Sequence, residues 1–156
     1  EENRSAVDLL IGELEHLATE NGLAYLKFMS DQVIAAAGID TDPVQGADQI
    51  AGFALAVQQL CHRLFATRQS QLTFRIGLDH GPVIGSVIGP DQRSYNLWGE
   101  AIRIAGTMAD TSLPGSVQAT ESVYRLLRNQ YLFQVRGTHY LEGVGEFTTY
   151  MMSGRL

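Results

Sequence analysis

Several residue types are scarce in this sequence, and each scarcity narrows what the protein can be. Of 156 residues, one is cysteine, four are proline and one is tryptophan. The single cysteine, Cys61, excludes an internal disulfide framework and a zinc site built from several cysteines. Its apolar helical surroundings predict a place in the core. No apolar run approaches the roughly 20 residues that cross a bilayer, and one cysteine is compatible with the reducing cytosol, so we expect a cytoplasmic domain without a membrane span.

Positive charge is also sparse. The 11 lysines and arginines are scattered among 17 acidic residues and leave a net charge of -6. Because nucleic acid is a polyanion, the proteins that bind it usually carry a basic stripe. Its absence argues against nucleic acid as a partner, and against an RNA-recognition module in particular. The 45% hydrophobic and 18% charged residues are instead typical of one globular domain over residues 1–156.

Hydrophobic periodicity and turn residues predict helices interleaved with strands. The expected helices cover residues 3–21, 43–66, 99–110 and 121–128. The expected strands cover residues 24–28, 32–37, 72–79, 83–88, 95–98, 116–119, 131–137 and 146–152, with 72–79 and 83–88 paired as a hairpin. Asp42 and Thr120 are expected to cap the helices that follow them. The pattern predicts an α+β fold, a ferredoxin-like sandwich with helices covering a mixed or antiparallel sheet. It does not identify a function.

Five motifs in collinear order do suggest a family. The run RIGLDHGPVIGSVIG at 75–89 resembles the signature segment of class III adenylate and guanylate cyclases. YNLWG at 95–99 resembles that family's Y-D-x-W-G, and KFMSD at 27–31 resembles its K-x-x-G-D. PGSV at 114–117 and GVGEFTTY at 143–150 match later landmarks. The resemblance covers nearly the whole chain, and it implies a cyclase homology domain with a dimer-forming hairpin.

The resemblance also implies a reaction. In the family, the ribose 3′-hydroxyl of ATP or GTP attacks the α-phosphate, which releases pyrophosphate and leaves a 3′,5′-cyclic nucleotide for intracellular signalling. Two domains share each active site across a head-to-tail dimer, and Mg²⁺ or Mn²⁺ is held by paired aspartates. One aspartate belongs to an F-x-D-I strand before the first helix. No such motif is found here, so we expect either a domain without that strand or a strand further upstream.

Three positions match the family's binding residues. The resemblance makes Asp31 a metal ligand, and the alternative is a polar residue of a tight turn. Lys27 matches the lysine that contacts the purine ring, and the alternative is a solvated strand lysine. Asn96 occupies the second purine position, where an amide can both donate and accept hydrogen bonds. It therefore leaves the choice between adenine and guanine open.

Other positions depart from the family. Its helix after Y-D-x-W-G carries asparagine and arginine four residues apart, on one face, for the ribose and the phosphates. Here Arg103 and Thr107 stand there and are the candidate catalytic pair, with a solvated surface arginine as the alternative for Arg103. Glu142 and Val144 stand where a lysine would reach the terminal phosphate. His80 is interpreted as a turn residue and not as a general base.

These departures leave two functions open. The first is a cyclase whose activity is weak, divergent or dependent on a partner domain, either in a homodimer or in a heterodimer. The second is a catalytically inactive pseudo-cyclase that acts as a regulatory or dimerisation domain. Loss of one preorganised donor of this kind costs roughly 10²–10³ in rate, so loss of several removes most activity unless another group compensates.

Overall fold

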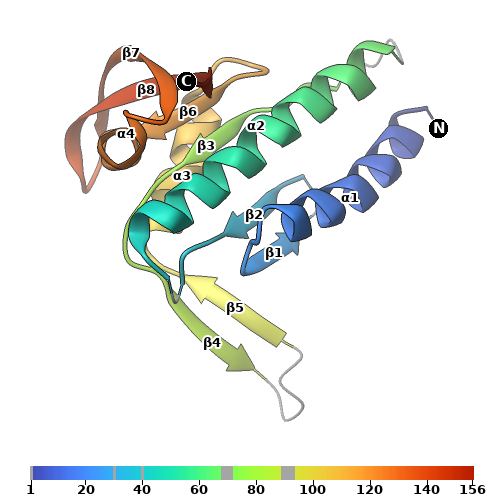
Figure 1. Cartoon of the computed structure of the whole chain (residues 1–156), viewed down its shortest axis with the longest axis horizontal. Helices are drawn as coiled ribbons and strands as arrows, with labels where there is room; N and C mark the ends of the chain where they lie inside the picture. Colours follow the sequence, from blue (N-terminus) through green and yellow to red (C-terminus); the bar gives the residue numbers. More distant parts are fainter. Residues whose placement is uncertain (1, 30, 40, 68–71, 89–93) are drawn as a thin grey trace.

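Helices and strands alternate along the chain as the sequence predicts (Figure 1). The computed structural model describes residues 2–29, 31–39, 41–67, 72–88 and 94–156. Its helices are α1 (Glu2–Glu20), α2 (Pro43–Thr67), α3 (Glu100–Thr111) and α4 (Glu121–Leu127). Its strands are β1 (Tyr25–Phe28), β2 (Val33–Ala36), β3 (Ile76–Leu78), β4 (Ile84–Ile88), β5 (Ser94–Trp98), β6 (Val117–Thr120), β7 (Tyr131–Leu141) and β8 (Gly145–Arg155).

The described strands form three sheets. A four-stranded mixed sheet has the order β3-β6-β8-β7, in which β3 and β6 are parallel and the other pairs are antiparallel. The pairs β1–β2 and β4–β5 are separate antiparallel hairpins. The expected mixed sheet with covering helices is therefore confirmed, although the structure divides the strands among three sheets.

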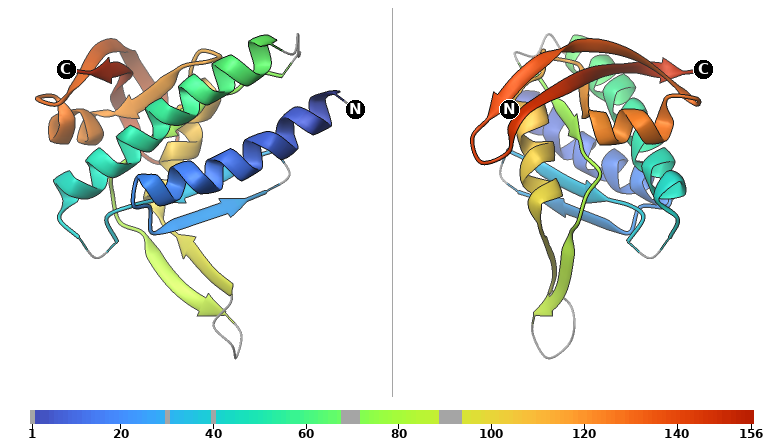
Figure 2. Two further views of the ribbon diagram at one scale, coloured as in Figure 1. Left: turned by 45° about the vertical axis from the view of Figure 1, so that its right-hand side comes forward. Right: turned by 90° about the vertical axis from the view of Figure 1, so that its left-hand side faces the viewer.

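Alternation along β3 and β6 places helices on both faces of the four-stranded sheet. Ile76 and Leu78 join the cluster of α2 alanines and α4 residues that forms the main core. Gly77 lies between them and faces α3, where an added Cβ would stand only 2.1 Å from the carbonyl oxygen of Ala105. Successive strand residues point to opposite faces. The sheet is thus covered by α2 and α4 on one face and by α3 on the other (Figure 2).

Helix α2 spans two sheets. Its small residues, Ala47, Ala51 and Ala54, pack in the main core over β3 and β6. Phe53 packs in a second cluster with α1 and the β1–β2 hairpin, and Ile50 contacts both clusters. The hairpin therefore lies beside the four-stranded sheet under one shared helix. In the described ranges, β2 pairs only with β1, and β3 pairs only with β6.

One of the two expected helix caps is confirmed in full, and the structure adds a glycine signal at the end of α1. The carboxylate of Asp42 accepts hydrogen bonds from the backbone N–H groups of Val44 at 3.1 Å and Gln45 at 3.2 Å, and thereby caps α2. Gly22 has a positive φ of 70° directly after α1, as a left-handed helix end requires. Thr120 does occupy the N-cap position of α4, but its side chain makes no cap hydrogen bond and donates to Asp79 instead.

The predicted hairpin of residues 72–79 and 83–88 is wrong. Strand β3 is shorter than expected and pairs in parallel with β6, whereas β4 pairs with β5. The segment before β3 is fixed by other contacts: the carbonyl of Phe74 accepts from the Gly115 N–H at 2.7 Å, and the Phe74 ring meets that of His62 edge-on. Alternation in sequence identifies a strand, but it does not identify the strand's partner.

The last two strands are longer than expected, because two register shifts carry the pairing beyond Val135 to the turn at 141–145. Cys61 is buried, as predicted. At the far end of β8, Arg155 approaches α2 at Gly52, where an added Cβ would lie 2.8 Å from its guanidinium and 2.9 Å from the Asn21 side chain. Across the described residues, no helix combines the length and the apolar character that a membrane crossing needs.

Candidate functional site

Two of the predicted site residues share the β1–β2 hairpin. Lys27 lies on β1 opposite Ile34 of β2 and is half-buried. Asp31 lies in the turn between the strands and is exposed, where a hydrogen bond of 2.8 Å from the Met29 N–H to the Gln32 carbonyl closes the turn. The structure therefore brings the candidate purine ligand and the candidate metal ligand onto one small element.

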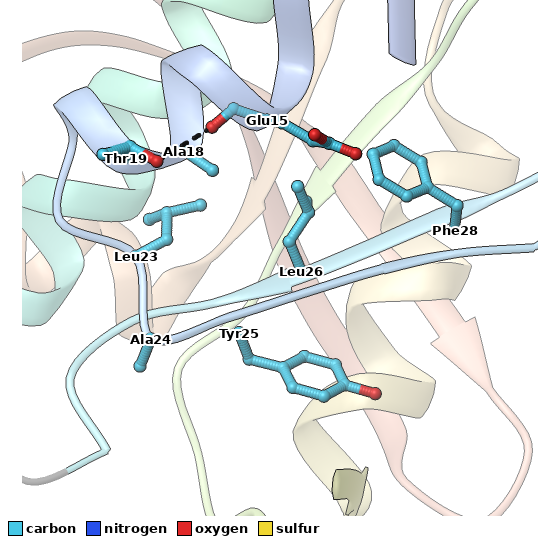
Figure 3. A pocket seen from close by; sticks show the side chains of 8 residues that line it. All are labelled: Glu15, Ala18, Thr19, Leu23, Ala24, Tyr25, Leu26 and Phe28. Atoms are coloured by element: carbon cyan, nitrogen blue, oxygen red, sulfur yellow. Dashed lines mark hydrogen bonds between the residues drawn. The ribbon is translucent and has the colours of Figure 1, made fainter. Parts of the chain in front are cut away.

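Strand alternation assigns faces to this hairpin. Leu26 and Phe28 point toward α1 and line a hollow of about 460 Å³ together with residues of α1 (Figure 3). Tyr25 points to the opposite face, and Lys27 shares that face because it lies two residues further along the strand. The hollow lies between the hairpin and α1. Tyr25 also contributes to its lining, but none of the predicted site residues does.

Asn96 lies on β5, in register with Ser86 of β4. Its backbone position is described, but its side chain lies outside what the structure describes. Strand β5 ends at Trp98 and leads through Gly99 directly into α3. The second predicted purine-site residue is thus on a different element from Lys27, and it is joined covalently to the helix that carries the candidate catalytic pair.

The candidate catalytic pair lies on α3, one helical turn apart, as predicted. The guanidinium of Arg103 donates to both carboxylate oxygens of Glu100, three residues earlier. This hydrogen bonding lowers the pKa of Glu100 and raises the pKa of Arg103, although both side chains are exposed. The Thr107 hydroxyl donates back to the Arg103 carbonyl at 3.2 Å. The only cation of the pair is therefore neutralised locally.

Glu100 was missed by the sequence analysis. The spacing of three residues between an acid and an arginine on one helix is the signal that could have found it. Its position in the first turn of α3 also places a negative charge near the positive end of the helix dipole, which is a favourable arrangement. A polyphosphate approaching Arg103 would meet this carboxylate beside it.

A buried amide and an arginine hold the other end of α3. Gln118 is fully buried, and its amide donates to the Met108 carbonyl at 2.8 Å and to the Thr111 hydroxyl at 2.9 Å. Arg136 of β7 donates to the Thr111 carbonyl and to the Gln118 side-chain oxygen. A cation at a helix C-terminus is stabilising. Together with the close approach at Gly77, these contacts fix α3 against the sheet.

The turn between β7 and β8 carries no cation. Glu142 and Val144 are both exposed there, and the Val144 N–H donates to the Leu141 carbonyl at 3.0 Å. A carboxylate repels phosphate and an isopropyl group cannot donate a hydrogen bond to it. This turn therefore offers no side chain that would bind a terminal phosphate.

The described residues offer a divalent cation only one predicted ligand, and the ion would need several. Among the residues that the structure describes, no group of three or more histidine, cysteine, aspartate or glutamate side chains is arranged to hold a metal. Asp31 is exposed at its turn and supplies a single carboxylate. Mg²⁺ usually takes one or two carboxylates together with phosphate oxygens. We therefore assign no reaction step to a metal.

His80 lies in the connection between β3 and β4, as predicted, and its carbonyl lies 3.1 Å from the Ser122 hydroxyl, which donates to it.

The family model for the adenylate and guanylate cyclase catalytic domain matches residues 1–154. The chain belongs to this family. The expected class III cyclase homology is thereby confirmed.

Curated and solved relatives agree with this assignment. An adenylate cyclase of Mycobacterium tuberculosis is 28% identical over 96% of this chain, which spans about a third (34%) of that protein's length. The guanylate cyclase domain of RhGC from Catenaria anguillulae, solved in complex with GTP, has a TM-score of 0.85 and 25% identity, with coverage of 99% and 85% of the two chains. A dimeric guanylyl cyclase domain from Blastocladiella emersonii has a TM-score of 0.82 at 24% identity, with coverage of 98% and 84%, and supports the fold.

Proposed function

We propose that this cyclase domain converts ATP or GTP to a 3′,5′-cyclic nucleotide and pyrophosphate in a heterodimer with a second, complementary cyclase domain. In this reaction the ribose 3′-oxygen forms a bond to the α-phosphorus, the bond from that phosphorus to the pyrophosphate oxygen breaks, and the 3′-hydroxyl proton is lost. This chain contributes the β1–β2 hairpin with Asp31, and the partner contributes the asparagine, arginine and lysine of the shared site. The wild-type homodimer has weak activity.

The distribution of residues between the two half-sites carries this proposal. The β1–β2 hairpin keeps Asp31, which belongs to the metal-binding half of a shared site, and Lys27, which belongs to the purine-binding half. In that second half, α3 and the β7–β8 turn hold Arg103, Thr107 and Val144 where the family has its ribose and phosphate ligands. Arg103 is moreover paired with Glu100. The half with Asp31 therefore keeps this aspartate, and the other half keeps Lys27 but is depleted of its ribose and phosphate ligands, which is the pattern expected when a different chain supplies them.

The substrate and its setting follow from the same residues. Lys27 and Asn96 are proposed to contact the purine, and an amide at Asn96 can match either base. The similar proteins include an adenylate cyclase and a cyclase domain solved with GTP, so both nucleotides remain substrates to test. Mg²⁺ or Mn²⁺ is the proposed cofactor, with Asp31 as one ligand. The cytoplasm is the proposed compartment, since nucleoside triphosphates are available there.

A further strand is also proposed for the complete domain. Strands β2 and β3 each pair with one neighbour in the described residues, and α2 covers both of the sheets to which they belong. An unpaired strand edge is a liability that native proteins usually cover. We propose that a strand outside these 156 residues pairs between β2 and β3, where it would stand beside the Asp31 turn and join the hairpin to the four-stranded sheet.

A complementation experiment tests the heterodimer. One protein is the wild-type full chain. The other carries Arg103→Asn, Thr107→Arg and Val144→Lys, which restore the depleted half, together with Asp31→Ala, which disables the preserved half. Each alone is expected to show little cyclic nucleotide formation with ATP or GTP and Mn²⁺. Their mixture is expected to gain about 100-fold or more, since each restored donor is worth roughly 10²–10³ in rate.

The matched control is Asp31→Ala without the three restoring substitutions, which should not complement the wild-type chain. Isothermal titration with non-hydrolysable ATP and GTP analogues follows on the same mixtures. A mixture that is no more active than its components contradicts the heterodimer proposal. If those mixtures also fail to bind either analogue, the pseudo-cyclase is favoured. The Glu100–Arg103 pair and the uncharged Thr107 would then belong to a site that no longer binds a nucleotide.

A further inference from the structure

The β4–β5 hairpin, called the arm below, projects from the body of the molecule and is joined to it at its base (Figures 1 and 2). Its two strands pair with each other from Ile84–Trp98 to Ile88–Ser94. The chain enters the arm through residues 79–83 and leaves it through Gly99 into α3. Whatever fixes these two connections therefore fixes the direction of the arm relative to α3.

Asp79 anchors the incoming connection. Its Oδ1 accepts a hydrogen bond from the Thr120 hydroxyl at 2.7 Å and lies 3.3 Å from the Ser122 hydroxyl. The Ser122 hydroxyl also lies 3.1 Å from the His80 carbonyl, so its single proton is shared between two acceptors of the same connection. Thr120 ends β6 and Ser122 lies in the first turn of α4. The carboxylate thus ties the end of β3 to the β6–α4 junction.

The outgoing connection at Gly99 packs closely against the incoming segment, residues 79–83, from the other side. Gly99 has a φ of 145°, and an added Cβ would stand 2.5 Å from the Pro82 carbonyl oxygen and 2.9 Å from the Val83 Cα. A Cβ on Gly81 would lie 3.4 Å from that of Ala101 on α3. Residues 79–83 are therefore held between the start of α4 and the start of α3, with little space to shift.

We propose that Asp79 is a positioning residue whose carboxylate, held by Thr120 and Ser122, sets the direction in which the arm leaves the body and thereby places Asn96 relative to Arg103 in the shared site. The link to the shared site rests on the proposed function, but the link to the arm does not. Burial raises the pKa of Asp79, against the opposing effect of its hydrogen bonds from Thr120, the His80 N–H and Ser122. The carboxylate is half-buried at a junction and is not a fully solvated surface group.

Hydrogen exchange of the full chain, read by mass spectrometry, tests the positioning role. Asp79→Ala is expected to raise amide exchange at residues 80–88 and 94–99 by about 10-fold or more, and to leave β6, β7 and β8 unchanged, because local opening is governed by local contacts. Asp79→Asn keeps an acceptor oxygen for Thr120 and should restore most of the protection. Asp110→Ala removes an exposed acid from α3 and should change nothing.

Two results would overturn the proposal. One is unchanged exchange in the arm of Asp79→Ala, and the other is a rise of equal size throughout the body, which would make Asp79 an ordinary stability residue. Should Asp79→Ala fail to fold, Thr120→Val removes one donor and serves the same comparison. Binding of a non-hydrolysable ATP or GTP analogue to the complementing mixture is measured in parallel: arm exchange that rises without any loss of analogue binding leaves Asp79 as the anchor of the arm but contradicts its role in the shared site.

Discussion

The four-stranded sheet and the arm both contain antiparallel pairs of strands, but they use their apolar side chains differently. In the sheet and its helices, Val117, Leu127 and Tyr131 are at most 1% exposed. In the arm, Ile84 and Trp98 stand opposite each other in register and are 67% and 49% exposed. The apolar core of the sheet is thus buried within the chain, although Leu132, Val135 and Tyr140 of β7 stay exposed, whereas the apolar pair at the base of the arm remains available to another molecule. Large exposed apolar residues that cluster in this way mark association surfaces.

The largest effect on stability is expected when a single methyl group is added in the body of the molecule. Gly77→Ala would place a Cβ 2.1 Å from the Ala105 carbonyl oxygen and 2.3 Å from the Ala109 nitrogen, both of them backbone atoms of α3. We expect a loss of about 3 kcal/mol or more in the free energy of unfolding, measured with urea, because overpacked backbone cannot give way.

The matched control for Gly77 is Gly106→Ala on α3, where an added Cβ meets no atom within 4 Å. It should stabilise the domain by roughly 0.5–1 kcal/mol, as alanine does in place of glycine inside a helix. Equal effects of the two substitutions would show that the close approach of α3 to β3 does not limit stability.

A smaller loss is expected when one part-buried hydrogen bond is removed. The Tyr131 hydroxyl donates to the Asp48 carboxylate at 2.5 Å and joins β7 to α2. Tyr131→Phe should cost about 1.5 kcal/mol in urea unfolding, since a hydrogen bond to a charged group contributes roughly 1.5–3 kcal/mol. Tyr140→Phe removes the same hydroxyl from a side chain that is 75% exposed and should cost almost nothing. Similar losses from both would contradict the assignment.

A pH dependence of stability is expected from a buried group in the body. Burial raises the pKa of the Cys61 thiol from 9.0 to about 11. The neutral thiol is therefore favoured by folding, and its contribution to stability is fully present below pH 9 and is lost as the pH rises through about 11. Urea unfolding over this range should show wild type losing stability relative to Cys61→Ala. Parallel curves for the two proteins would contradict this assignment.

The smallest effect on unfolding is expected at the arm. Trp98→Ala should change the free energy of unfolding by less than about 0.5 kcal/mol, because the side chain is largely exposed. The same substitution should weaken association by about 10-fold or more in sedimentation, as loss of an aromatic interface residue does. Leu132→Ala on β7 has a similar exposure of 47% and should leave association unchanged. Equal effects on association would break the distinction between arm and body.

Prediction of the fold from the sequence succeeded where the signal was local. The Asp42-Pro43 start predicted α2. The alanines along this helix then account for its close packing over the strands. Prediction failed where the answer depended on distant partners. The alternation in residues 72–79 could not show that β3 pairs with β6, which lies about 40 residues further along the chain. The length of β7 was underestimated because Gly137 interrupts the pattern at a register shift.

The candidate site divides in the same way. The family resemblance selected Arg103 and Thr107, and their spacing of four residues predicted that they share one helix face. The pairing of Arg103 with Glu100 is readable by the same spacing rule. The contacts that hold α3 in place were not readable. Gln118 and Arg136 are 18 residues apart and meet only because β6 and β7 flank β8 in the folded sheet. Asp79 likewise gains its partners from residues more than 40 positions away.

The approach of Arg155 and Asn21 to Gly52 has a consequence for the order of folding events. These side chains come from the end of the last strand and the end of the first helix, so their meeting on α2 closes a loop that contains most of the chain. The entropy lost in closing so long a loop is recovered only after the intervening elements have formed. Docking of the β8 terminus is therefore expected to be a late step, and a substitution at Gly52 should accelerate unfolding more than it slows folding.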